Sequence, residues 1–213
     1  MSALFPKKLA REEVSAEKKL AHVKVRTPAE RIYTPVTTNL PLQQGELLTN
    51  IFQYQVSLDS VGSDELSIEI KTHPYAIILS QACDLDLDRK NPDKPQRLPN
   101  ILLCEVEEAA VLRPKTDSRT WDRIKINKDE RYHFLQAVPP ELDIQAKGLP
   151  ELGLDFKRYF SIPQNELYKQ ISLGIVQRRT TLQSPYLEHL SSRYAAYLSR
   201  IGLPFDHESQ SEA

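Results

Sequence analysis

The residues with the clearest chemical potential lie in one short motif, Ser80-Gln81-Ala82-Cys83-Asp84-Leu85. The motif follows an apolar run at 75–79 that reads as a buried strand, and strand ends commonly present functional side chains to a loop. A thiol enzyme needs a thiolate, a base and an orienting acid or amide, and the candidates here are Cys83, His133 and Asp84. The alternative is structural, with the same side chains packing or hydrogen-bonding the turn.

Metal chemistry has less support in the sequence. The candidate ligands are Cys83, Asp84, Cys104 and His133, and the chain has no CxxC, HxxxH or HxxE spacing. A structural zinc site uses four ligands at recognisable spacing. We therefore predict no metal site and no cofactor.

Nucleic-acid binding would use local basic patches. The candidates are Lys90 and Lys94 in the segment 89–97, and Arg178 and Arg179 in the segment 177–181, with a further basic stretch at 7–19. Aromatic side chains that could stack on bases are Tyr132, Phe134, Tyr159 and Phe160. The structural alternative places these aromatic residues in the core.

A partner surface is suggested by tyrosines near the end of the chain. Tyr186, Tyr194 and Tyr197 follow helical spacing, and aromatic residues are enriched at interfaces. We predict that Tyr194 and Tyr197 face a homodimer mate or another protein. Alternatively, the same stripe packs on its own domain.

Short strands followed by helices must position these residues. Alternation and apolar runs predict strands at 47–57, 66–70, 75–79, 101–106, 121–127, 131–137 and 155–162. A turn at 59–64 and a polar loop at 84–99 separate them. Helices are predicted at 163–171 and at 184–201, the latter with Ser184 as N-cap and Pro185 in the first turn.

This order predicts a mainly β chain with C-terminal α structure. The architecture is an SH3-like small barrel or a bent antiparallel sheet with a helical extension. The predicted divisions are an N-terminal arm and proline-containing linker (1–44), a barrel-like domain (45–162), a helical extension (163–204) and a disordered acidic tail (205–213).

Composition narrows the class. The 213 residues include 28 Lys and Arg and 29 Asp and Glu, for a formal net charge of −1, which disfavours a domain built mainly to bind a phosphate backbone. The first residues form no apolar signal sequence, and no window approaches the roughly 18 apolar residues of a membrane span. We expect a cytoplasmic protein without membrane contact, with reduced, buried thiols at Cys83 and Cys104.

Two segments resemble the opening of the MazF/PemK-type endoribonuclease toxins, namely Gln44-Gly45-Glu46-Leu47-Leu48 and Pro74-Tyr75-Ala76-Ile77-Ile78-Leu79-Ser80. The resemblance implies an SH3-like barrel that dimerises and cuts single-stranded RNA without a metal. In that family an arginine precedes the proline, and His73 takes its place here; an imidazole would stabilise a developing phosphorane charge only when protonated. Glu46 stands where an Asp is usual. The resemblance thus implies a candidate ribonuclease site with His73 and Ser80.

The chain also resembles a bacterial family with a Ser-Gln-x-Cys-Asp-Leu motif, here residues 80–85. Members often end with a Pro-Tyr-x-Glu-x-Leu helix and a Gly-Leu-Pro stop, here 185–190 and 202–204. The leading hypothesis is a bacterial cytoplasmic interaction module, an accessory in a toxin–antitoxin or phage-defence setting. The alternatives are a metal-independent endoribonuclease or other nucleic-acid-binding protein, and a thiol enzyme using Cys83. The sequence leaves open whether the chain is an enzyme.

Overall fold

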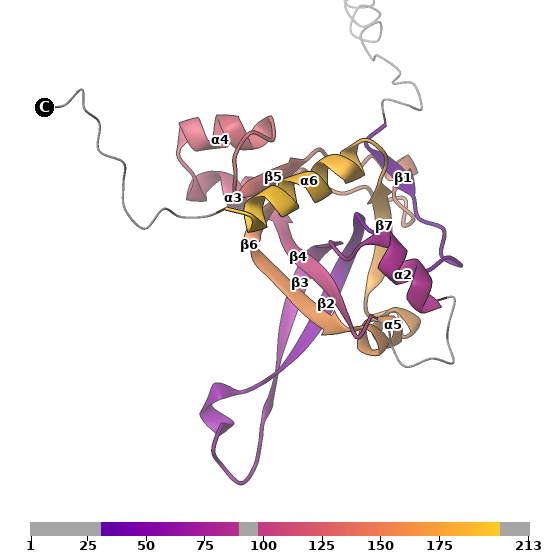
Figure 1. The fold of residues 1–213 in the computed structure, drawn as a ribbon, viewed down its shortest axis with the longest axis vertical. Helices are drawn as coiled ribbons and strands as arrows, with labels where there is room; N and C mark the ends of the chain where they lie inside the picture. The colour runs from indigo at the N-terminus through magenta and orange to yellow at the C-terminus, as the bar shows by residue number, and fades with distance from the viewer. Residues whose placement is uncertain (1–30, 90–97, 201–213) are drawn as a thin grey trace, which may run out of the picture. The chain divides into compact units, whose positions relative to one another are not determined.

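The computed structural model describes residues 31–89 and 98–200 (Figure 1). Within these ranges, seven antiparallel strands form one sheet in the order β1-β7-β2-β3-β4-β6-β5. The strands are β1 (Tyr33–Pro35), β2 (Glu46–Val56), β3 (Ile68–Ile78), β4 (Asn100–Glu108), β5 (Tyr132–Leu135), β6 (Leu152–Pro163) and β7 (Gln177–Leu182). The helices are α2 (Ala82–Arg89), α3 (Ala109–Leu112), α4 (Ser118–Lys125), α5 (Gln164–Ser172) and α6 (Tyr186–Leu198).

The sheet is open, with β1 and β5 as its edges. The segment that follows β5 nevertheless reaches the opposite edge of the sheet, formed by β1 and β7. The Tyr33 hydroxyl of β1 donates to the Gln136 carbonyl at 2.6 Å, and the Ile144 amide donates to the Arg179 carbonyl at 2.9 Å. These contacts confirm a mainly β chain with a strongly bent antiparallel sheet and a C-terminal helix; the strands do not close into a barrel.

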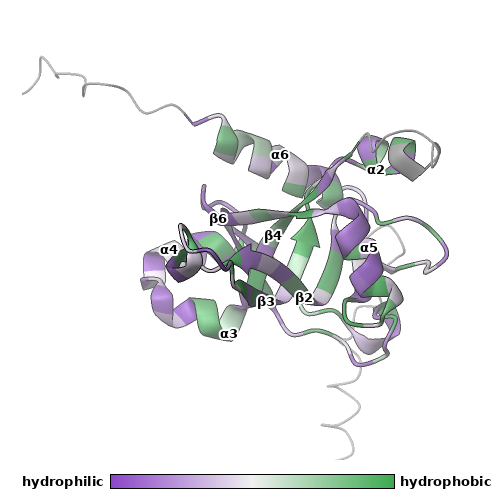
Figure 2. Cartoon of the chain, turned by 90° about the horizontal axis from the view of Figure 1, so that it is seen from below, coloured by the Kyte–Doolittle hydropathy of each residue, from purple (hydrophilic) through white to green (hydrophobic). Residues whose placement is uncertain are grey.

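Two apolar clusters lie on the two faces of the sheet, because successive side chains of a strand point in opposite directions. Leu47 and Ile77 belong to one cluster, which is covered by Leu190 of α6. Leu48 and Ile78 belong to the other, which is covered by Leu167 of α5. In Figure 2 the central strands carry mainly the hydrophobic colour, whereas α5 shows more of the hydrophilic one.

Two elements differ from the sequence predictions. Residues 121–127 were predicted as a strand, but Ser118–Lys125 form α4, whose N-cap Asp117 accepts a hydrogen bond from the Thr120 amide at 2.9 Å. The predicted loop at 84–99 begins with α2, because Leu85 is buried in the second cluster. In both cases the helix has only eight residues and few of them are apolar, too few to give a clear period.

The ends of the sheet and of the last helix also differ. β1 and β7 belong to the sheet although they lie outside the predicted range 45–162, and β7 was not predicted as a strand. α6 begins at Tyr186 after Pro185 in the cap position, so Ser184 provides no side-chain cap. Residues 1–30 and the tail 205–213 lie outside the described residues.

Across residues 31–89 and 98–200, every helix is too short or too polar to cross a bilayer.

Candidate functional site

The Ser80-Gln81-Ala82-Cys83-Asp84-Leu85 motif forms the junction between β3 and α2. The Ser80 hydroxyl accepts a hydrogen bond from the Leu102 amide at 2.8 Å, and the Ser80 amide donates to the Leu102 carbonyl at 3.2 Å. Ser80 is buried and joins the end of β3 to β4. Ser80 thus has the structural role that was the alternative for this motif. Its hydroxyl, which the ribonuclease interpretation requires, is engaged in the hydrogen bond to the Leu102 amide.

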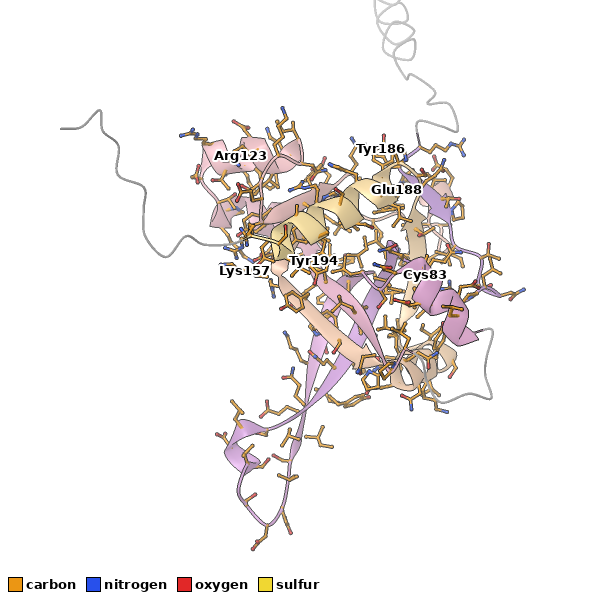
Figure 3. The ribbon with its side chains drawn as sticks, viewed as in Figure 1. Cys83, Arg123, Lys157, Tyr186, Glu188 and Tyr194 are labelled. Atoms are coloured by element: carbon orange, nitrogen blue, oxygen red, sulfur yellow. The ribbon has the colours of Figure 1, made fainter. Side chains whose placement is uncertain are left out.

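Cys83 is exposed in the first turn of α2, so the expectation of a buried thiol is wrong for this residue (Figure 3). Its sulfur lies 3.5 Å from Gln81 Oε1 and 3.9 Å from Asp84 Oδ1. Among the described residues, the hydrogen bonds of Cys83 include none to a histidine. Cys104 is buried as expected, and burial raises the pKa of its thiol.

His133 lies on β5, where it is 3% exposed. Its ring packs against His189 and Phe156, with ring centroids 5.6 and 6.2 Å away. Burial, reinforced by the charge of Arg193, lowers the pKa of His133 to about 3. The imidazole is therefore neutral at physiological pH and sits within the packed edge of the sheet.

His73 is fully buried at the base of the β2–β3 hairpin. The ring stacks on Phe160 with centroids 3.9 Å apart, Nε2 lies 3.1 Å from Gln53 Oε1, and Nδ1 lies 3.4 Å from Glu105 Oε2. Burial lowers the pKa of His73, although the nearby carboxylate of Glu105 opposes the shift. A fully covered, stacked ring is not placed to touch an RNA phosphate.

Arg178 and Arg179 do not form a basic surface patch, because both side chains are buried and paired. Arg178 forms an ion pair with Glu46 and donates to the Leu40 carbonyl at 2.7 Å. Arg179 binds Asp143 in a bidentate manner, at 2.8 and 2.6 Å. Lys90 and Lys94, the other predicted nucleic-acid contacts, lie outside the described residues.

The two carboxylates respond differently to their buried positions. Burial raises the pKa of Glu46, and the bonds to Arg178 only partly oppose this shift. For Asp143, burial is outweighed by the Arg179 bond and by backbone amides, so its pKa lies below the usual value. These ion pairs tie β7 to the segments on either side of it, which is the structural reason for two adjacent arginines in a strand.

Tyr194 and Tyr197 pack on the chain's own core. Both rings lie with centroids 5.6 Å from that of Phe156, and both side chains are half-buried. Burial, with a smaller contribution from neighbouring Tyr159, raises the pKa of Tyr194 to about 12. The stripe is thus mainly an internal contact of α6.

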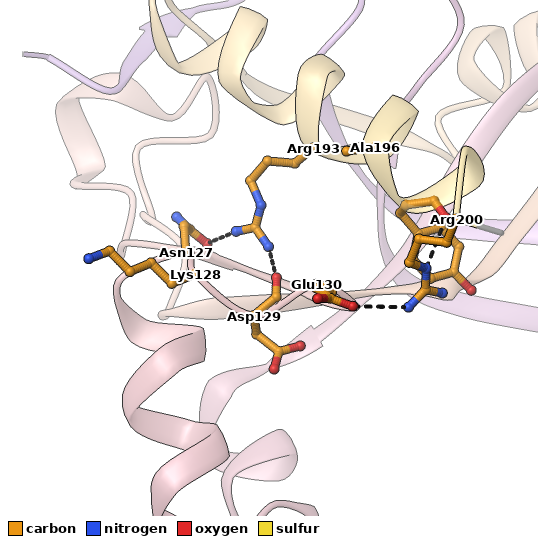
Figure 4. Close-up of a pocket in the computed structure, with 8 residues that line it drawn as sticks. Asn127, Lys128, Asp129, Glu130, Arg193, Ala196 and Arg200 are labelled. Atoms are coloured by element: carbon orange, nitrogen blue, oxygen red, sulfur yellow. Dashed lines mark hydrogen bonds and ion pairs between the residues drawn. The ribbon is translucent and has the colours of Figure 1, made fainter. Parts of the chain in front are cut away.

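A pocket of about 380 Å³ lies between α6 and the turn at 127–130 (Figure 4). Arg193 projects across it and donates to Asn127 Oδ1 at 3.1 Å and to the carbonyls of Asp129 and Tyr132. Arg200 faces Glu130 at 3.8 Å. Arg193 is already hydrogen-bonded to backbone and amide oxygens. Its role at this pocket is therefore structural, because these bonds hold α6 against the turn before β5.

The hairpin of β2 and β3 offers a different kind of surface. Only the proximal part of the hairpin is paired with other strands: β7 ends its pairing with β2 at Thr49, and β4 ends its pairing with β3 at Tyr75. Beyond these residues, up to Val56 and Ile68, each of the two strands has the other as its sole strand partner within residues 31–89 and 98–200. This two-stranded extension, residues 52–72, projects from the sheet in Figure 1. It is named the arm from this point on and is distinct from the N-terminal segment 1–44.

One face of the arm is apolar and exposed. Tyr54 is paired with Ile70 and Val56 with Ile68, so the two cross-strand pairs lie on the same face at a spacing of two residues. The opposite face carries Gln53, Gln55, Glu69 and Lys71. With the tip residues, seven large apolar side chains of the arm are between 46% and 87% exposed: Tyr54, Val56, Leu58, Val61, Leu66, Ile68 and Ile70.

The alternation at 66–70 is typical of a strand with one buried face, and a strand does begin at Ile68, but its apolar side chains are exposed, so the expected burial is wrong. Alternation identified the apolar face correctly. It did not reveal that the face has no covering element among the described residues. The exposed apolar face of the arm is the site that sequence reasoning missed.

The arm is also acidic. Residues 47–70 contain no Lys or Arg and carry Asp59, Asp64, Glu65 and Glu69. Lys71 follows at the base, 3.8 Å from Glu105. An acidic, apolar ribbon has the opposite charge from a surface that binds phosphates or anionic lipids.

In the described part of the chain, His, Cys, Asp and Glu side chains form no cluster of three or more that could bind a metal ion. Comparison with known proteins finds no matching family model, no similar curated protein and no similar solved structure.

Proposed function

We propose that this chain is a protein-interaction module whose contact surface is the apolar face of the arm. The observation that carries the proposal is the exposure of Tyr54, Val56, Ile68 and Ile70 on one face of a ribbon that extends beyond the sheet. Large exposed apolar patches on proteins mark sites of association. The accessory role in a toxin–antitoxin or phage-defence setting would suit a module of this kind.

Charge favours a protein over a nucleic acid as the partner. A surface that neutralises phosphates needs Lys or Arg, and residues 47–70 have neither. The predicted basic residues Arg178 and Arg179 are paired internally with Glu46 and Asp143. An apolar face bordered by carboxylates instead resembles the anatomy of a protein interface, with an apolar centre and a polar rim.

A site-specific photo-crosslinking experiment tests this proposal. The photoreactive amino acid p-benzoylphenylalanine would replace Ile68 on the apolar face or, as the matched control, its neighbour Glu69 on the polar face. Both positions are exposed and lie on the same strand, so they differ mainly in the direction of the side chain. We expect a covalent protein adduct from position 68 after illumination in cells, and little adduct from position 69.

Adducts of equal yield from both positions would mean random collision and would contradict the proposal. An absence of adducts from position 68 would also contradict it, provided that the labelled chain is folded. Foldedness is checked by circular dichroism, and we expect both substitutions to leave it unchanged because the arm lies outside the two core clusters.

A further inference from the structure

We infer that the partner of the apolar face is a second copy of this chain, so that two arms pack face to face in a two-fold dimer. The inference rests on the proposed function, since it identifies the occupant of the same surface. It is carried by the size of the face, by its symmetry and by the distribution of charge along the arm.

The exposed apolar area is suited to a dimer. The exposed parts of the seven arm residues amount to on the order of 700 Å², of which the four on the face supply about half and the three in the turn at the tip the rest; the largest apolar patch on a typical monomer is roughly 300–600 Å². A standard stable interface buries about 800 Å² on each partner. The apolar side chains of the face and the tip, together with the polar groups that border them, therefore approach the area that one subunit of a stable dimer contributes.

The geometry of the face is self-complementary. Its two cross-strand pairs, Tyr54 with Ile70 and Val56 with Ile68, form two short parallel rows of apolar side chains. A two-fold axis that lies between the two faces and runs perpendicular to the strands places each row against a row of the other copy, running in the opposite direction. Such packing gives the ribbon the second layer that an isolated two-stranded hairpin lacks, at the roughly 10 Å spacing of stacked sheets.

The charge pattern is compatible with this arrangement. The acidic residues Asp59, Asp64 and Glu65 lie in the turn at the tip, whereas Lys71 lies at the base. In a two-fold antiparallel pair, the tip of one arm lies toward the base of the other, so the acidic tips are at opposite ends. The formal net charge of −1 also produces little long-range repulsion between two whole chains.

Sedimentation equilibrium of the full-length purified chain over a wide concentration range tests the inference. We expect a monomer–dimer equilibrium. Ile68→Asp should raise the dissociation constant by about 30-fold or more, because it places a charge at the centre of the apolar face. Gln55→Asp adds the same charge on the opposite face and is the matched control, with an expected change of less than about threefold.

A second variant guards against local misfolding of the arm. Leu58→Ser at the tip, where the side chain is 87% exposed, should also weaken the dimer while thermal unfolding at low protein concentration stays unchanged. A wild-type chain that is monomeric at every concentration would overturn the inference. A dimer that survives both Ile68→Asp and Leu58→Ser would overturn it as well, because association would then use another surface.

The two proposals fail in distinguishable ways. A monomeric chain whose position 68 crosslinks to a different protein overturns the dimer but leaves the interaction module standing. A chain that neither associates nor crosslinks from position 68 overturns both. An adduct with the mass of two copies, together with the loss of dimer in Ile68→Asp, supports both.

Discussion

At the residue scale, His133 couples the stability of the fold to pH. Its Nδ1 is buried without a hydrogen-bond partner among the described residues, and the groups around it are Arg193 and His189. The unfolded chain binds a proton at His133 near pH 6.5, whereas burial lowers the pKa in the folded chain to about 3. The unfolded state therefore binds more protons between these values, and stability falls as the pH drops below about 6.5, by at most about 1.4 kcal/mol per pH unit.

The free energy of unfolding, measured by urea titration at several pH values between about 5 and 7, should fall with decreasing pH in this way. This pH window lies above the range where most carboxylates titrate. His133→Phe keeps an uncharged ring in the apolar site and should reduce the pH dependence by the share of His133, leaving the share of His73, whose pKa burial also lowers. His189→Asn is the control, because His189 lies beside His133 but is exposed and should contribute less. An unchanged slope in His133→Phe would mean that another group takes up the proton.

At the element scale, α6 is held to the sheet by one side of its surface. Leu190 is 1% exposed within the first apolar cluster, whereas Leu198 at the end of the same helix is 55% exposed. Leu190→Ala should lower the free energy of unfolding by about 2–5 kcal/mol through lost burial and the cavity left behind. Leu198→Ala is the matched control and should change it by less than about 0.5 kcal/mol. Denaturant titration measures both, and equal losses would show that the helix is anchored elsewhere.

The predictability of each element follows from where its stabilising contacts lie. Strands with alternating or continuous apolar residues, such as 75–79 and 101–106, were predicted because their burial is visible locally. β7 was missed because Arg178 and Arg179 read as surface residues, and their burial depends on Glu46 and Asp143, which are distant in the sequence. The arm was predicted as two strands and a turn, but its exposure depends on the neighbouring strands ending early, which no local pattern records.

At the scale of the whole molecule, the arm contacts the body of the sheet through its base, where the Gln170 side chain is hydrogen-bonded to the Phe52 backbone. The two apolar clusters draw on β2 only up to Ile51 and on β3 only from Tyr75, so the distal arm contributes nothing to either. The arm's exposed apolar face thus adds little to the stability of one chain, while it exposes surface that association would bury. The body would carry the stability of the fold, and the arm the association.

Shortening the arm tests this division of roles. Replacing residues 55–69 by Asn-Gly joins Tyr54 to Ile70, which already face each other across the hairpin, through a turn of the type that favours two-residue hairpins. The shortened chain should unfold at a temperature close to that of the full chain at low concentration, because both clusters are intact and the closed loop is shorter.

For the full chain we expect the unfolding temperature to rise with protein concentration, since dimerisation stabilises the folded state by mass action. The shortened chain and Ile68→Asp should both lose that dependence, whereas Gln55→Asp should keep it. A shortened chain that fails to fold would show that the arm belongs to the core after all, and a concentration dependence retained without the arm would place the dimer contact on the body.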